Sequence, residues 1–176
     1  LIGTLTVDGS SYDLSQIEFN DDTETIPPGP SEAHYFLMSY YVDNGTNRPQ
    51  IVYSADTDSW GTIQLSGTGS LRDGATDDSG RSVAVGDSGM IFSTDDGGTW
   101  TRRASGLTGA RLFAVEWANG VWVVAGESVI LASSDGTSWS VAWTPGDSDG
   151  SPTFRAVAHG SGDNWLTFAR ELPEHY

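Results

Sequence analysis

Apolar residues occur in short runs along the chain, and these runs are rich in β-branched and aromatic side chains. Clusters of Gly, Asp, Asn and Ser separate them, as turns separate strands. No window carries the i, i+3, i+4, i+7 stripe of an amphipathic helix over three turns. The pattern therefore predicts an all-β fold. The runs are Leu5–Val7, Tyr35–Val42, Ile51–Tyr53, Val83–Val85, Val121–Ala125 and Val129–Leu131.

Three tryptophans, Trp60, Trp100 and Trp139, lie 40 and 39 residues apart, and each closes a similar phrase. The middle phrase has the form Ser-x-Asp-x-Gly-x-Thr-Trp, the third is one residue shorter, and the first lacks the glycine. Such self-similarity at a fixed period indicates a repeat architecture. The residues that define the phrases are Ser54, Asp56 and Trp60, then Ser93, Asp95, Gly97 and Trp100, then Ser133, Asp135, Gly136 and Trp139.

Two further columns of apolar residues repeat in the same register upstream of the phrases. One column begins at Leu71, Leu112 and Phe154, and the other comprises 81–86, 121–126 and 164–169. These columns divide the chain into units at about 33–70, 71–111 and 112–153, with part of a fourth at 154–176. We expect each complete unit to be an antiparallel meander of about four strands.

The Ser-x-Asp phrase has a physical role within such a meander. Its Asp side chain can accept backbone N–H groups of its own turn, and its glycine can adopt positive φ. The tryptophan that follows opens the fourth strand and can pack under the turn as a buried plug. We therefore interpret these residues as structural.

The phrase from Ser93 to Trp100 resembles the Asp-box, or bacterial neuraminidase repeat, of β-propellers such as sialidases and photosystem assembly factors. The whole unit is also similar to propeller-like repeats in tail, fibre and capsid-associated proteins of tailed phages. The resemblance covers roughly residues 33–176 and is most specific in the middle unit. In that family the Asp-box lies on the blade periphery, away from the active site. The resemblance thus implies a β-propeller-like fold rather than an activity.

About three and a half units are few for a closed propeller, which has four to eight blades. Residues 1–30 read as a strand-like arm followed by an acidic, proline-rich connector, and residues 31–176 as the repeat domain. Strands within Ile2–Phe19 could close a ring. Otherwise we expect an open or irregular assembly whose edges partner chains cover.

The chain carries 24 acidic residues against 8 basic ones, all of them arginine, for a formal charge of -16. That charge repels phosphate backbones and excludes nucleic-acid binding through a basic patch. The chain has no cysteine, which excludes disulfides and thiol catalysis. No apolar run is long enough to span a bilayer, and we expect no secretory signal.

A sialidase-like enzyme would need an arginine triad, a Tyr/Glu nucleophile pair and an acid/base Asp. Arg72, Arg111 and Arg155 lie near the starts of three units, where inner strands could converge. None matches the family's arginine motif, and no Tyr/Glu constellation can be placed. We expect these arginines to pair with surrounding acids, and we expect no enzyme, because nucleophile elbows and phosphate loops are also absent.

Other candidate sites are weak. His34, His159 and His175 have no metal-ligand spacing, and we expect neither a metal nor a cofactor. The 147–150 stretch has the first ligands of a calcium loop without the later ones, and we interpret it as a solvated turn. The Asn44-Gly45-Thr46 sequon reads as a hairpin turn.

Aromatic residues outside the tryptophan column could stack on sugars. Trp117, Trp143, Tyr40 and Tyr41 are the candidates, and core packing is the alternative reading. We expect a non-catalytic structural or attachment component of a larger assembly, located in a tailed-phage virion, with other protein subunits and a host-surface glycan as partners. The alternative is a glycan-binding or sialidase-like module, extracellular or cytoplasmic and soluble.

Overall fold

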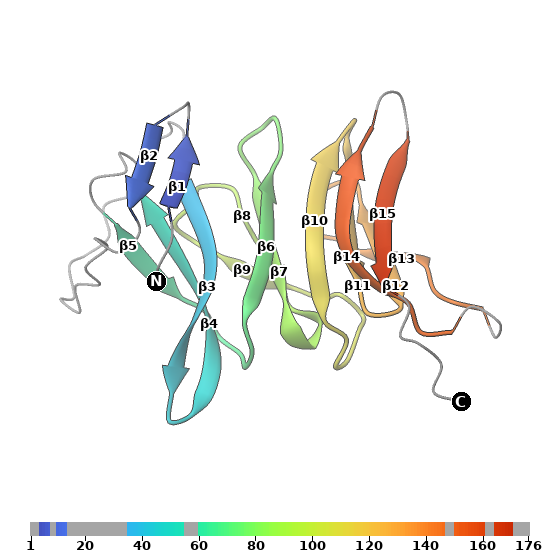
Figure 1. Cartoon of the computed structure of the whole chain (residues 1–176), viewed down its shortest axis with the longest axis horizontal. Coiled ribbons are helices and arrows are strands. Elements are labelled where there is room, and N and C mark those ends of the chain that lie inside the picture. Colours follow the sequence, from blue (N-terminus) through green and yellow to red (C-terminus); the bar gives the residue numbers. More distant parts are fainter. Residues whose placement is uncertain are drawn as a thin grey trace.

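The computed structural model describes residues 4–7, 10–13, 35–54, 60–146, 150–160 and 164–170, and the acidic, proline-rich connector that ends at residue 30 lies outside this part. Within these residues the regular structure is β, apart from the single 3-10 turn η2 (Asp87–Gly89). The all-β prediction is therefore confirmed. The strands (Figure 1) are β1 (Thr4–Val7), β2 (Ser10–Asp13), β3 (Tyr35–Asp43), β4 (Thr46–Ser54), β5 (Gly61–Gln64), β6 (Leu71–Thr76), β7 (Ser82–Gly86), β8 (Ile91–Thr94), β9 (Thr101–Arg103), β10 (Leu112–Ala118), β11 (Val121–Gly126), β12 (Val129–Ser133), β13 (Ser140–Trp143), β14 (Thr153–His159) and β15 (Trp165–Arg170).

These strands form five antiparallel sheets in which chain neighbours pair. The second sheet (β6–β9) and the third sheet (β10–β13) are four-stranded meanders, as the repeat predicts. The first sheet (β3–β5) has three strands and the fourth sheet (β14–β15) has two. The hairpin β1–β2 is a separate two-stranded sheet. Between β3 and β4 the chain turns at Asn44 and Gly45 with positive φ, which confirms the expected hairpin turn.

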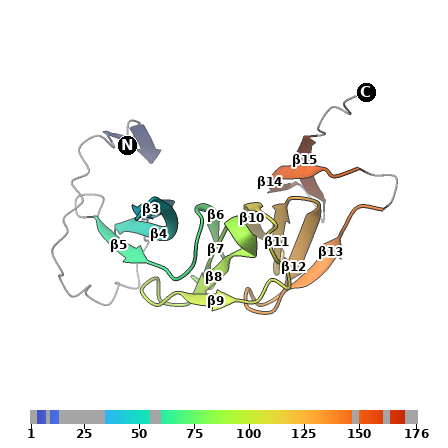
Figure 2. The ribbon, with the colours of Figure 1, turned by 90° about the horizontal axis from the view of Figure 1, so that it is seen from below.

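The first to fourth sheets stand in a row, because β6 lies against β3, β10 against β6, and β14 against β10. Figure 2 shows the row from below, with the β1–β2 hairpin at the end of the first sheet and β14–β15 at the other end. The described sheets do not close into a ring. Each sheet is therefore packed mainly against its neighbours in the chain.

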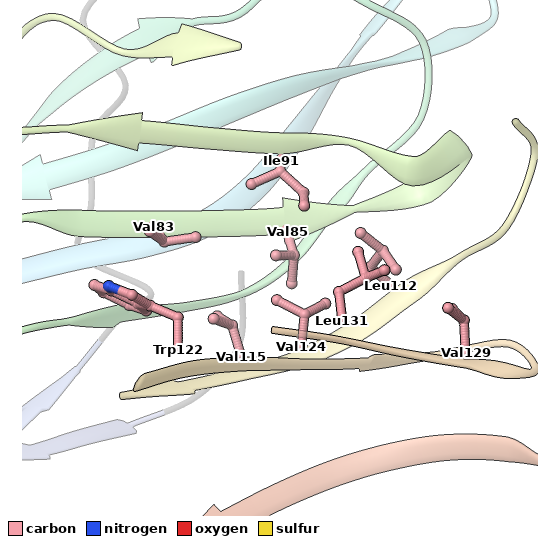
Figure 3. Packing of buried hydrophobic residues seen from close by; sticks show 9 residues of the cluster. All are labelled: Val83, Val85, Ile91, Leu112, Val115, Trp122, Val124, Val129 and Leu131. Carbon is pink, nitrogen blue, oxygen red and sulfur yellow. The ribbon is translucent and has the colours of Figure 1, made fainter. Parts of the chain in front are cut away.

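Three hydrophobic cores fill the spaces between successive sheets. The middle core lies between the second and third sheets, where Val83 and Val85 face Trp122 and Val124 (Figure 3). All four are nearly inaccessible to solvent. The other two cores lie on either side of it, one between the first and second sheets and one between the third and fourth. Burial of this kind stabilises the row by about 25 cal/mol for each Å² of apolar surface removed from water.

The sheets follow one repeat register. In β7, Val83 and Val85 face the following sheet, as Val123 and Ala125 do in β11. The pairs Tyr35↔Ser54, Ser82↔Thr94 and Trp122↔Ser133 align β3 with β7 and β11. In this alignment Phe36 and Met38 of β3 occupy the positions of Val83 and Val85 in β7. The strand β3 is thus equivalent to the second strand of the later sheets. In the described residues the first sheet lacks a first strand, and the fourth sheet lacks a third and a fourth.

Candidate functional site

The first strands β6, β10 and β14 each begin with a β-bulge. The pairing register shifts between Leu71 and Asp73, between Leu112 and Ala114, and between Phe154 and Ala156. The extra residue in each case is Arg72, Phe113 or Arg155. Because a bulge redirects the side chain of its extra residue, three equivalent bulges on neighbouring strands can bring these side chains together.

Phe113 is the centre of this group. The guanidinium carbon of Arg72 lies 5.2 Å from the centroid of its ring, and that of Arg155 lies 4.5 Å from it. Both distances are within the range of cation–π attraction. The two arginines were candidates from the sequence, whereas the phenylalanine between them was not. Its place in the column of Arg72 and Arg155 was the available signal.

Asp87 and Glu127 hold Arg72 and the neighbouring Arg111 in place. Arg72 donates from Nε to Asp87 at 2.7 Å, and Asp87 also accepts the backbone N–H of Ser70 at 3.0 Å. Arg111 lies 3.8 Å from Asp87 and 3.6 Å from Glu127. The expectation that Arg72 and Arg111 pair with acids is confirmed. Arg155 is exposed, and its interaction within the described part of the chain is with Phe113.

A shallow polar depression of about 490 Å³ lies beside Asp87 and Arg111. The start of β4 and the segments before β6 and β10 contribute others of its residues, including Asn47, Thr68 and Gly109. No aromatic ring lines it. The depression therefore offers hydrogen-bonding groups and no stacking surface for a sugar.

The Ser-x-Asp turns are built as the repeat predicts, with one shift. In the third sheet Ser133 accepts the N–H of Gly136 at 2.9 Å, and Asp135 accepts the N–H groups of Thr137 and Ser138. Gly136 has φ +65°, in the left-handed region. Because both N–H groups stabilise the carboxylate, they hold the pKa of Asp135 well below its usual range.

In the second sheet the same roles fall one residue later than the sequence spacing suggested. Thr94, rather than Ser93, accepts the N–H of Gly97 at 2.9 Å. Asp96, rather than Asp95, accepts the N–H groups of Gly98 and Thr99, which lower its pKa. The shift gives this turn the spacing of the third one, with six residues from hydroxyl to tryptophan in both.

The displaced residues take other partners. Ser93 is buried and accepts a hydrogen bond from Nε of Arg103 at 2.8 Å. Asp95 is exposed and accepts a hydrogen bond from Nε of Arg81 at 2.6 Å. This hydrogen bond raises the pKa of the Arg81 guanidinium. Arg81 also donates to the backbone carbonyl of Asp135 in the third sheet. This arginine therefore ties the Ser-x-Asp turns of two successive sheets together.

The tryptophans of the phrases immediately precede the fourth strands. Trp100 precedes β9 and packs partly buried against the core between the first and second sheets. Its indole N–H donates to the carbonyl of Gly97 at 3.0 Å. Trp139 precedes β13 and packs partly buried against the middle core. In the first sheet Ser54 is buried and Trp60 precedes β5, whereas Asp56 lies outside the described residues.

The candidate glycan platform is not assembled. Trp117 packs on Trp122 with ring centroids 5.2 Å apart, and Trp143 packs edge-on against Phe154 at 5.1 Å. Tyr40 is exposed and Tyr41 is half-buried, and both lie on β3. The four side chains thus belong to three strands of two different sheets, and the two tryptophans contribute to the packing between sheets.

No cluster of three metal-ligating side chains occurs among the residues that the structure describes. His159 contacts Asn119 and Trp165, while His34, His175 and 147–149 lie outside those residues. None of the described helical structure is long and apolar enough to cross a membrane. No protein-family model matches the chain, and no curated protein matches it either.

Proposed function

We propose that this protein is a non-catalytic structural or attachment component of a larger assembly, and that its sheets are blades of a propeller-like repeat. The observation that carries the proposal is the exposed apolar face of the fourth sheet. Leu166 and Phe168 of β15 are 55% and 64% exposed. On β11 the equivalent Val123 and Ala125 are 8% and 0% exposed.

The contrast has a simple cause. Val123 and Ala125 are covered by Phe154 and Val157 of the next sheet, and no described sheet follows β15. Single exposed apolar side chains are normal, but here the exposed residues repeat the positions of an internal interface. We infer that another protein surface covers this face in the working assembly.

A tailed-phage particle is the setting that we propose. Its support is the resemblance of the 71–111 and 112–153 units to repeats in phage tail, fibre and capsid-associated proteins. The charge of -16 opposes non-specific clustering of copies and favours contacts through defined apolar surfaces. Other protein subunits are the proposed partners, with a host-surface glycan as the target of an attachment role.

Removal of residues 1–30 tests the proposal. Particles from cells that express the full-length chain should contain it, and particles from cells that express the shortened chain should lack it. The shortened chain should still unfold cooperatively on heating, because the three cores use residues from 36 onward. An unfolded body after the deletion, together with a full-length chain that stays monomeric at high concentration, would contradict the assembly role.

A second candidate is a sialidase-like or glycan-binding module, favoured by the gathering of Arg72, Arg111 and Arg155 around Phe113 and Asp87. Asp87 and Glu127 already neutralise Arg72 and Arg111, which leaves little charge for a substrate carboxylate. We therefore expect no turnover of a fluorogenic sialoside and no selective signal on a glycan array. Turnover that Arg155→Ala abolishes would replace the structural role with the enzymatic one.

A further inference from the structure

The fourth sheet is incomplete at its outer edge. In the second and third sheets a third strand, β8 or β12, pairs with the outer edge of the second strand. In the described residues β15 pairs with β14 alone. The backbone N–H and C=O groups along its other edge are therefore available for a further strand.

The β1–β2 hairpin has the composition of the two strands that the fourth sheet lacks. Third strands are apolar and buried, as Ile91–Thr94 and Val129–Ser133 show, whereas fourth strands are mostly exposed. The hairpin repeats this order, since β1 reads Thr-Leu-Thr-Val and β2 reads Ser-Ser-Tyr-Asp. Neither strand pairs with any other described strand.

Chain order agrees with composition. The second and third sheets run first, second, third and fourth strand, each antiparallel to the one before. In the described part of the chain the fourth sheet has no strand after its second, and β1 followed by β2 supplies a third and a fourth in the right order and sense. Together, β14, β15, β1 and β2 would make four strands, the number found in the second and third sheets.

A second copy of this chain is the partner that the arrangement selects. Figures 1 and 2 place β1–β2 at the first-sheet end of the row and β14–β15 at the opposite end. Copies placed end to end therefore bring the hairpin of one copy to the free edge of the other. Such a contact joins two different surfaces and can continue from copy to copy.

We propose that β1 of one copy pairs antiparallel with β15 of another, so that the β1–β2 hairpin completes the fourth sheet. The inference rests on the proposed assembly role and names a partner for it. Backbone pairing of this kind needs no complementary charge, and it is therefore compatible with a chain of charge -16.

Cysteine cross-linking of the full-length chain tests the pairing, because the natural chain contains no cysteine. One set of variants carries Leu166→Cys or Phe168→Cys on the exposed face of β15. The other carries a single cysteine at Thr4, Leu5, Thr6 or Val7 in turn. Mixed under oxidising conditions, the two sets should form disulfide-linked dimers, because cross-strand Cα atoms lie within disulfide range.

The cross-linking yields at the four β1 positions distinguish strand pairing from random collision of the chains. Alternate positions of β1 should cross-link, since only every second side chain of a strand shares a face with Leu166 and Phe168. Val141→Cys is the matched control, because Val141 is 52% exposed on the fourth strand β13. Yields should exceed this control at least about tenfold, because pairing raises the effective concentration of the thiols. Thermal melts identify any variant that fails to fold.

Three results would overturn the inference: yields no higher than the Val141→Cys control, equal yields at all four β1 positions, or a disulfide within a single chain that carries both cysteines. The last result would mean that the hairpin closes the fourth sheet of its own chain. Loss of particle incorporation after deletion of residues 1–30, with no cross-link, would leave the assembly role standing and remove only this pairing.

Discussion

Trp100 joins a turn to a core. Its indole donates to the carbonyl of Gly97, and its ring packs edge-on against Phe36 with centroids 5.8 Å apart. The residue therefore links the Ser-x-Asp turn of the second sheet to the core that this sheet shares with the first. A side chain in this position stabilises both a turn and an interface between sheets.

We expect Trp100→Ala to lower the free energy of unfolding by about 3 kcal/mol, at the low end for a large aromatic because the side chain is only partly buried. The melting temperature should fall by roughly 5–10 °C. Val141→Ala, at an exposed position, is the control and should melt close to the wild type. A Trp100→Ala melt within a degree or so of the wild type would contradict the structural role.

The sequence predicted which types of residue build the Ser-x-Asp turns better than it predicted which individual residue takes each role. The sequence contains two adjacent acids, Asp95 and Asp96, and either can start the spacing to Trp100. The choice depends on which carboxylate faces the N–H groups of Gly98 and Thr99, and that follows from the backbone path. Arg81, which donates to Asp95 from the position just before β7, lies 14 positions away and gave no local signal.

The Ser133–Trp139 turn makes the free energy of unfolding depend on pH in the acidic range. Its backbone N–H groups lower the pKa of Asp135, so its contribution is present above the ordinary value of 3.8 and is lost as pH falls through the lowered value. Asp96 in the second sheet behaves in the same sense. Burial raises the pKa of Asp73, so its cost to stability is absent below the ordinary value of 3.8 and develops as pH rises from there through the raised value.

We expect Asp135→Asn to lower the free energy of unfolding by about 1 kcal/mol at neutral pH, because the amide is a weaker acceptor than the carboxylate. The difference from the wild type should shrink as pH falls below about 3.8, because the carboxylate of the unfolded chain then takes up a proton while that of the folded chain, with its lowered pKa, stays ionised. Thermal melts of both proteins across this range measure it. Asp78→Asn, at an exposed turn position, is the control. A difference that is constant with pH would contradict the assignment.

Strands and turns were predictable because their signals are local. Alternating or β-branched runs at 83–85, 121–125 and 129–131 lie within strands of the structure. The bulges at Arg72, Phe113 and Arg155 were not predicted, since a bulge depends on how a strand pairs with its neighbour. The cluster around Phe113 therefore became visible only with the sheets in place.

At the scale of the whole molecule, the repeat period predicted antiparallel meanders, and the second and third sheets confirm them. The period does not say whether a row of sheets closes. Closure depends on the angle between successive sheets and on strands contributed from outside the row. The propeller-like ring thus stays a proposal, and any strand that closes it has to pair with the outer edge of β15, which pairs with no described strand.

The division of the interior into three separate cores has a consequence for how the molecule comes apart. Each core depends only on the two sheets that enclose it. Stability is then nearly a sum of nearest-neighbour terms, as in a one-dimensional array. Among the described sheets of the row, the first and the fourth each have one such neighbour and the second and third have two. Thermal fluctuations should therefore detach an end sheet first while the middle core remains intact.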